Sequence, residues 1–310
     1  GDGTDLTITS GNDIVLAVST TGSAYCAGGQ GSNNTVFGKN AGDAIHSGAD
    51  SNSAFGEDSL GGSMTDAAHN NTAMGHKALF AITSGTRNVA IGSNALLAMD
   101  AGNYNTVMGH NAADALVGGT HNVIIGDHAG STTTDVDACV IIGQSACESG
   151  NMTSAADGTV AIGKGALVGL TSGAKNVAIG YSAMSAGLQA FNNVAIGYEA
   201  LNAIAGDDGA NCGHDNVAIG VDAMGSANAG THGSAKANDN IAIGTNALLG
   251  GDFGSSDKDF VGNIAIGYQA LDATSTNTQR GTIAIGHDAL TALTSGAGNI
   301  AIGYQAGTAL

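Results

Sequence analysis

Apolar and polar positions along the chain repeat in a short, fixed pattern. Three mostly apolar residues follow an asparagine and precede a glycine, as in Asn88-Val-Ala-Ile-Gly92, Asn176-Val-Ala-Ile-Gly180 and Asn299-Ile-Ala-Ile-Gly303. With Thr, Ser, Cys, Met and Phe allowed as substitutes, the phrase occurs fifteen times. Successive glycines are never fewer than 17 residues apart, and longer spacings only add residues. A constant minimum length predicts a repeating coil of fixed geometry, with loops inserted into some copies.

The residues before the repeat glycine predict one short strand in each coil. The residue directly before the glycine is large and apolar in every copy, so we expect it to point into the core. Two residues before the glycine stands only Ala, Val or Ile, and four before it stands Asn in twelve of the fifteen copies. Because side chains alternate along a strand, these two columns share the opposite face. Two mostly apolar faces are typical of parallel strands that are buried on both sides.

The residues after the glycine complete the predicted coil. Two variable residues are followed by Ala in fourteen copies and then usually by Leu or Met, a pattern that favours one short helical turn. A unit of 17 residues is too small to bury its own apolar face, so neighbouring coils must share a core. We therefore predict a repeat solenoid of the parallel β-roll or β-helix type over residues 34–310. The Asn column is predicted to stack into a ladder of side-chain amides.

Composition narrows the range of partners. Eight Lys and Arg residues stand against 26 Asp and Glu residues, which gives a formal charge of −18 that repels nucleic acids and anionic membrane surfaces. No apolar run approaches the roughly 18 residues of a membrane span. We thus expect neither nucleic acid binding nor membrane insertion. The absence of Pro suits strands that donate ladder hydrogen bonds to neighbours on both sides.

Motifs of catalysis or metal binding are missing from the sequence. The four cysteines, Cys26, Cys139, Cys147 and Cys212, form no C-x-x-C pair and have no His at zinc spacing, so we interpret them as unpaired. His76 and His110 follow repeat glycines two coils apart, too far for shared ligation of a metal. No G-x-S-x-G nucleophile motif occurs. We expect no catalytic residue, no cofactor and no metal.

Three consecutive spacings of 23, 24 and 23 residues place extra residues on adjacent coils, at about 206–215, 226–239 and 250–261. Insertions of this kind emerge on one face of a solenoid, where binding residues concentrate. The alternative is that they are merely tolerated surface loops, with their Phe residues packed beneath them as anchors. The candidate receptor-binding residues are Asp207, Asp208, His214, His232, Phe253, Lys258 and Phe260.

The alanine column two residues before the glycine suggests self-association. If the large residues point into the core, these small apolar residues face away from it, and tight contact with another subunit or with a second layer of the same chain would explain them. The candidate oligomer-interface residues are Ala178, Ala195, Ala218, Ala242 and Ala265.

The Asn-Val-Ala-Ile-Gly-Tyr phrase resembles the head repeats of trimeric autotransporter adhesins, and similar repeats are found in bacteriophage tail fibres. The resemblance covers about residues 34–307, and the opening segment, residues 1–33, looks like the strand-rich connectors of such fibres. It implies a homotrimeric, extracellular fibre shaft or head, at a cell or virion surface, that presents a surface for a glycan or protein receptor. Two alternatives are a filament subunit that stacks head to tail and an ice- or polysaccharide-binding solenoid.

Overall fold

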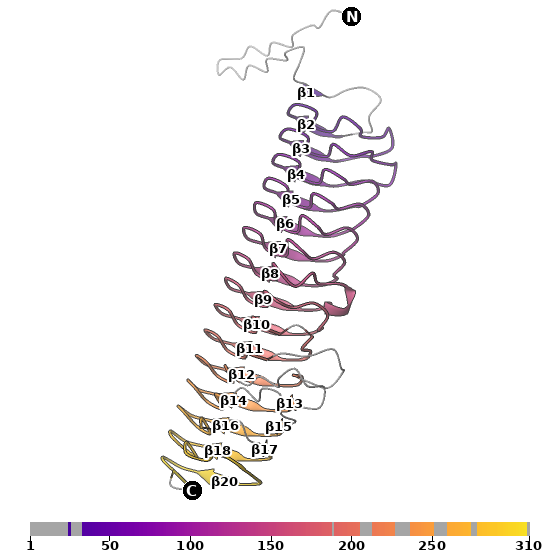
Figure 1. Cartoon of the computed structure of the whole chain (residues 1–310). Coiled ribbons are helices and arrows are strands. Elements are labelled where there is room, and N and C mark those ends of the chain that lie inside the picture. Colours follow the sequence, from indigo (N-terminus) through magenta and orange to yellow (C-terminus); the bar gives the residue numbers. More distant parts are fainter. Residues whose placement is uncertain are drawn as a thin grey trace, which may run out of the picture.

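The computed structural model describes residues 24–25, 33–187, 189–204, 213–226, 236–250, 259–273 and 278–308. These residues form a parallel β-solenoid, an elongated stack in which each coil contributes one strand to a continuous sheet (Figure 1). The predicted fold class is therefore confirmed. Among the described residues, no helix has both the length and the apolar character needed to cross a membrane.

The main sheet contains sixteen strands. Its first strand, β1 (Ala24–Tyr25), pairs antiparallel with β2, and the other fifteen strands pair in parallel with one another. These strands are β2 (Thr35–Phe37), β3 (Ser53–Phe55), β4 (Thr72–Met74), β5 (Val89–Ile91), β6 (Thr106–Met108), β7 (Val123–Ile125), β8 (Val140–Ile142), β9 (Val160–Ile162), β10 (Val177–Ile179), β11 (Val194–Ile196), β12 (Val217–Ile219), β14 (Ile241–Ile243), β16 (Ile264–Ile266), β18 (Ile283–Ile285) and β20 (Ile300–Ile302).

The register between coils is the one that the repeat glycine predicts. Ile91 pairs with Met108, Met108 with Ile125, and Ile125 with Ile142, so residues directly before the glycine stack on successive strands. The glycine itself has a positive φ, 133° at Gly92, and a Cβ atom built there would lie 2.3 Å from the carbonyl oxygen of Gly109 in the next coil. Only glycine satisfies both the backbone angle and this close approach.

The prediction of which strand face is buried is wrong. The middle residue of each three-residue strand points into the coil and is buried, for example Ala90 and Ala178, whereas the residue before the glycine points outward. Exposed fractions of 43% for Met108 and 67% for Ile302 exclude that column from the core. The interior is narrow: the strand supplies Ala in most coils and Val or Ile in the others, and the opposite side of the coil fills the remaining space with larger residues such as Leu96 and Met99.

The short helical turn expected after each glycine is also absent from the coils that the structure describes. Asn94 and Leu96 have φ values of 59° and 53°, and this alternation of left-handed residues prevents consecutive helical hydrogen bonds. The backbone instead continues the ladder between coils, since the Leu96 amide donates to the Ala112 carbonyl oxygen at 3.1 Å. Within the described ranges, a single 3₁₀ turn at Ser154–Ala156 is the one helical element.

A second, smaller sheet accompanies the last four coils. Its four parallel strands are β13 (Lys236–Asn238), β15 (Asp259–Val261), β17 (Gln279–Arg280) and β19 (Gly296–Ala297). Each of them lies directly before the corner that leads into a strand of the main sheet. Ala237, Phe260 and Gln279 point inward from these strands and are buried.

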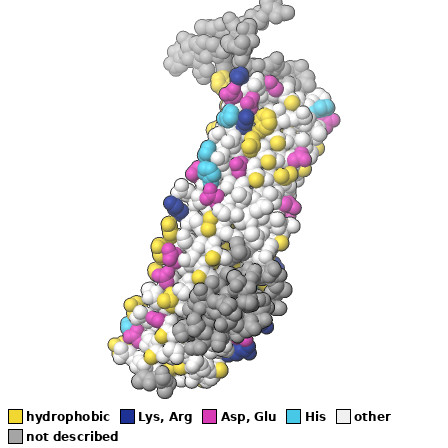
Figure 2. Space-filling view, viewed as in Figure 1, with side chains coloured by type: hydrophobic (Ala, Val, Ile, Leu, Met, Phe, Trp, Pro, Cys, Tyr) yellow, Lys and Arg dark blue, Asp and Glu magenta, His cyan; other side chains and the backbone are white. Residues whose placement is uncertain are grey.

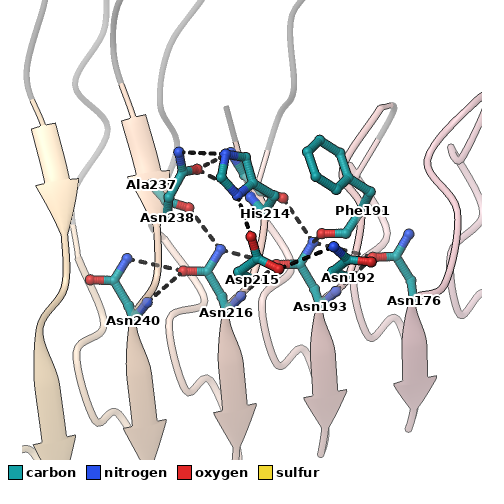
Figure 3. A network of polar contacts seen from close by, with 11 residues as sticks. Asn176, Phe191, Asn192, Asn193, His214, Asp215, Asn216, Ala237, Asn238 and Asn240 are labelled. Carbon is teal, nitrogen blue, oxygen red and sulfur yellow. Dashed lines mark hydrogen bonds and ion pairs between the residues drawn. The ribbon is translucent and has the colours of Figure 1, made fainter. Parts of the chain in front are cut away.

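The predicted asparagine ladder is present. The Asn105 side-chain amide donates to the Asn88 side-chain oxygen at 3.0 Å and to the Gly119 carbonyl oxygen at 2.7 Å. Its own side-chain oxygen accepts from the backbone and side-chain nitrogens of Asn122 at 3.1 and 2.9 Å. Figure 3 shows the same arrangement from Asn176 to Asn240. Each buried amide of the column in the described residues thus donates to a backbone carbonyl oxygen at least 14 residues later in the chain, and consecutive asparagines also bond to each other.

The ladder is interrupted where Cys139 and Thr159 occupy successive coils. The Thr159 hydroxyl is buried without a hydrogen-bond partner, and Cys139 offers no oxygen to the coil that follows. We expect the double substitution of both residues to Asn to raise the free energy of unfolding by about 1–2 kcal/mol, because each restored hydrogen bond contributes about 1 kcal/mol. Thermal unfolding followed by circular dichroism measures the effect. The control Thr159→Val removes the unpaired hydroxyl without rebuilding the ladder, and a double variant no more stable than this control would contradict the expectation.

Candidate interaction surface

The outward side chains of the main sheet form one continuous apolar surface. We call it the outer sheet face and define it as the first and third residues of each strand from β2 to β20 in the main sheet. None of its side chains carries a charge. In the first three strands the first residue is Thr or Ser and the third is Phe or Met, and from β8 onward both positions are always Val or Ile. The face is thus a long stripe, two side chains wide, of half-buried to exposed apolar residues.

Within the part of the chain that the structure describes, no second layer covers this face, which is unusual for a parallel sheet. Parallel sheets are ordinarily covered on both faces, and large apolar surface patches mark sites of interaction. Fifteen strands about 4.8 Å apart give a stripe about 67 Å long and about 10 Å wide, or roughly 700 Å². This area is close to the roughly 800 Å² that each partner contributes to a stable protein interface. The outer sheet face therefore has the composition and size of a contact surface.

The alanines predicted for the oligomer interface lie elsewhere. Ala178, Ala195, Ala218, Ala242 and Ala265 are all fully buried inside the coils of their own chain. They face the turn residues across the narrow interior, and no partner can reach them. The interface assignment is corrected accordingly: on each strand, the outward neighbours of the alanine are the residues available for contact.

Only two of the seven candidate receptor-binding residues, His214 and Phe260, lie among the described residues. Asp207, Asp208, His232, Phe253 and Lys258 lie outside the described residues. Phe260 is fully buried on β15, so its side chain packs beneath the coil surface, as the anchor alternative requires, and is not available to a receptor. His214 belongs to a local polar network.

The His214 network joins three successive coils (Figure 3). The His214 ring stacks on Phe191 with a centroid separation of 4.7 Å, and its Nδ1 lies 2.7 Å from an Asp215 carboxylate oxygen. Its Nε2 lies 2.9 Å from the Asn238 amide nitrogen. With both ring nitrogens engaged and the side chain mostly covered, His214 links its own coil to the coils on either side.

The two residues after each repeat glycine form a polar edge beside the outer sheet face; we call these two columns the corner columns. Neighbouring coils are paired there by matched side chains: Lys39 forms an ion pair with Glu57 at 2.9 Å, and Tyr181 stacks on Tyr198 at 5.3 Å. Histidine and acidic side chains also lie close together on the surface of the stack (Figure 2). The first of these columns faces solvent, since the exposed fractions of its tyrosines Tyr181 and Tyr198 are both 48%.

The two cysteines in the described residues are buried and unpaired. Burial raises the pKa of Cys139 to about 11 and also raises that of Cys147. Because the thiolate is the reactive form, both side chains act as small apolar fillers of the coil interior rather than as nucleophiles or metal ligands. Cys26 and Cys212 lie outside the described residues.

No protein-family model and no curated protein matches this sequence. The features that point to a function are therefore the solenoid fold and the outer sheet face.

Proposed function

We propose that this chain is a unit of an extracellular, non-catalytic fibre in which three copies pack their outer sheet faces together around a common axis. The observation that carries the proposal is the uncharged apolar stripe along the whole main sheet. Contact between copies covers the sheet on its second side, which removes the exposed side chains of Val, Ile, Met and Phe from water. The number three and the placement at a cell or virion surface rest on the resemblance to trimeric adhesin heads and phage tail fibres.

Self-complementarity favours another copy of the chain as the occupant. The stripe keeps one register over all fifteen parallel strands and offers no charged group to a partner. Copies related by an axis along the solenoid bring like side chains together, as closed symmetric assemblies require. The charges, with a net value of −18, remain on the outer surface and keep the assembled fibre soluble.

The adhesive part of the proposal assigns receptor contact to the surfaces left outside the assembly. Among the described residues these are the corner columns; the inserted segments near residues 206–215, 226–239 and 250–261 are further candidates from the sequence alone. Rigid repeats that display loops and exposed tyrosines suit the recognition of a cell-surface glycan or protein, because the scaffold limits the entropy lost on binding.

Sedimentation equilibrium of the isolated chain tests the assembly. Three copies of the 30.0 kDa chain have a mass of 90.0 kDa, which is the expected result. A mass of 30.0 kDa at micromolar concentration contradicts the proposal, and an open series of ever larger species favours the head-to-tail filament instead. A glycan array and a panel of whole cells, both probed with the fluorescently labelled chain, test adhesion. Absence of binding to every glycan and cell surface contradicts the adhesive part.

A further inference from the structure

Two histidines and one aspartate meet in the corner columns of two neighbouring coils. His110 directly follows Gly109 after β6, and Asp127 and His128 follow Gly126 after β7. Because Met108 pairs with Ile125, His110 and Asp127 stand at equivalent positions of adjacent coils. The backbone fixes the arrangement further, since the His128 amide donates to the His110 carbonyl oxygen at 2.9 Å.

The ligand atoms of these three side chains already lie close to one another. An Asp127 carboxylate oxygen is 3.2 Å from Nδ1 of His110 and 3.2 Å from Nδ1 of His128. One ligand atom of each residue lies within 4.8 Å of those of the other two. Four ligands placed tetrahedrally at about 2.0–2.1 Å from a zinc ion are separated from each other by about 3.3 Å. Two of the three separations therefore match a metal site without any movement.

We propose that His110, Asp127 and His128 form a surface binding site for a divalent transition metal ion, with Zn²⁺ as the ion that best fits the two nitrogens and one oxygen. The fourth position stays open to water or to one donor atom of another molecule. The site is independent of the proposed assembly, because all three ligands come from one chain.

The surroundings of the three ligands also favour a cation. Asp114 lies close enough to interact with the charges of both imidazoles, which oppose the rise in its pKa caused by burial. The Asn111 amide nitrogen lies 3.1 Å from the Nε2 atom of His128. The Asn111 side-chain oxygen accepts a hydrogen bond from the Asn94 amide nitrogen at 2.9 Å. If metal binding turns the Asn111 amide over at the expense of that bond, its oxygen accepts a hydrogen bond from Nε2–H of His128 and leaves Nδ1 free for the metal, which is the usual role of an outer partner of a metal-bound histidine.

Other histidines in the described part of the chain lack a third ligand. His214 pairs with Asp215 and His287 pairs with Asp288, and neither pair has a further His, Cys, Asp or Glu side chain close enough to complete a site. The competing explanation for His110, Asp127 and His128 is that they form ordinary hydrogen bonds between coils, like the Lys39–Glu57 pair in the same column. Metal binding separates the two explanations.

Isothermal titration of the full chain without a histidine tag, using ZnCl₂ at pH 7.5, tests the site. We expect one saturable ion for each chain, and we expect the separate substitutions His110→Ala and His128→Ala to weaken binding at least tenfold. Asn111→Ala should weaken it roughly tenfold, because it removes the outer partner of His128. The control His287→Ala, in a corner column of another coil, leaves both stoichiometry and affinity unchanged.

Two further measurements keep the result decisive. The visible absorption of the Co²⁺-loaded chain should show the intense bands of a four-coordinate ion, and Asp127→Asn should alter them. Circular dichroism confirms that each variant folds, and His110→Gln replaces His110→Ala if the latter does not. The proposal is overturned if no saturable Zn²⁺ binding occurs, or if the affinity is the same in His110→Gln and Asp127→Asn as in the original chain. Either outcome leaves these side chains as a hydrogen-bonded pairing of two coils.

Discussion

Substituting Ile179 and Ile196 together by Glu is expected to convert the assembled chain from a mass of 90.0 kDa to one of 30.0 kDa. Both residues are third residues of their strands, on β10 and β11, and belong to the outer sheet face. In a trimer this double substitution would place six unpaired carboxylates along the common axis. The cost of burying even one such charge without a partner, several kcal/mol, outweighs the gain from the surrounding apolar contacts.

The separated chains should remain folded, because each glutamate side chain reaches water once its coil no longer faces a partner. Sedimentation gives the mass, and far-ultraviolet circular dichroism shows that the solenoid persists. The matched control is the double variant Tyr181→Glu/Tyr198→Glu, in the corner column of the same two coils. It should leave the mass unchanged. An Ile179→Glu/Ile196→Glu variant that keeps the mass of the original chain would exclude the outer sheet face as the interface.

A second large effect is expected from Ala195→Glu, one residue away from Ile196 on the same strand. Ala195 is fully buried against the interior of its own coil. A glutamate there is too large for the narrow interior and leaves a charge with no partner, so the free energy of unfolding of the neighbouring coils should fall by roughly 3–5 kcal/mol. Because coils in a solenoid are stabilised by their neighbours, the loss extends along the stack.

Thermal unfolding of Ala195→Glu beside Ile196→Glu measures the contrast between the two faces of one strand. The inner substitution should lower the melting temperature of the chain whether it is assembled or not. The outer substitution, Ile196→Glu, should lower the mass of the assembly and leave the separated chain folded. If the melting temperature of Ala195→Glu equals that of the original chain, the alanine column does not lie in the core, and the assignment of strand faces given above is wrong.

The fold follows from the sequence more fully than the surface does. The repeat glycines fix the register, the number of parallel strands in the main sheet and the asparagine ladder, because each requirement leaves one recognisable residue in a column. Which strand face is buried does not follow in the same way, since Ala90 and Ile91 are both apolar and alternation alone assigns no side. The asparagine column held the missing signal: a buried amide shares its face with the alanine, and its hydrogen bonds lie inside the coil.

Local propensity was misleading in the turns. Ala and Leu favour helices, yet Leu96 adopts a left-handed conformation because the hydrogen bonds to the next coil outweigh its intrinsic preference. The frequent Asn and Asp residues two positions after the glycine were the available sign of left-handed backbone.

The metal ligands were missed for a different reason. His76 and His110 were compared with each other, but they lie two coils apart. The ligands His110, Asp127 and His128 lie on adjacent coils, where an offset of 17 residues places His110 beside Asp127.

Because every coil pairs with its neighbours in the same register, the length of the rod can change in evolution by whole coils. A coil that begins and ends at a repeat glycine presents the same hydrogen-bond donors, acceptors and side-chain columns to the next coil as the coil before it does. Recombination between two copies of the phrase can therefore remove or duplicate one whole coil and leave the junction native. Each such event shortens or lengthens the rod by about 4.8 Å. The reach of the molecule from its base can then evolve in small steps, separately from the residues that it displays.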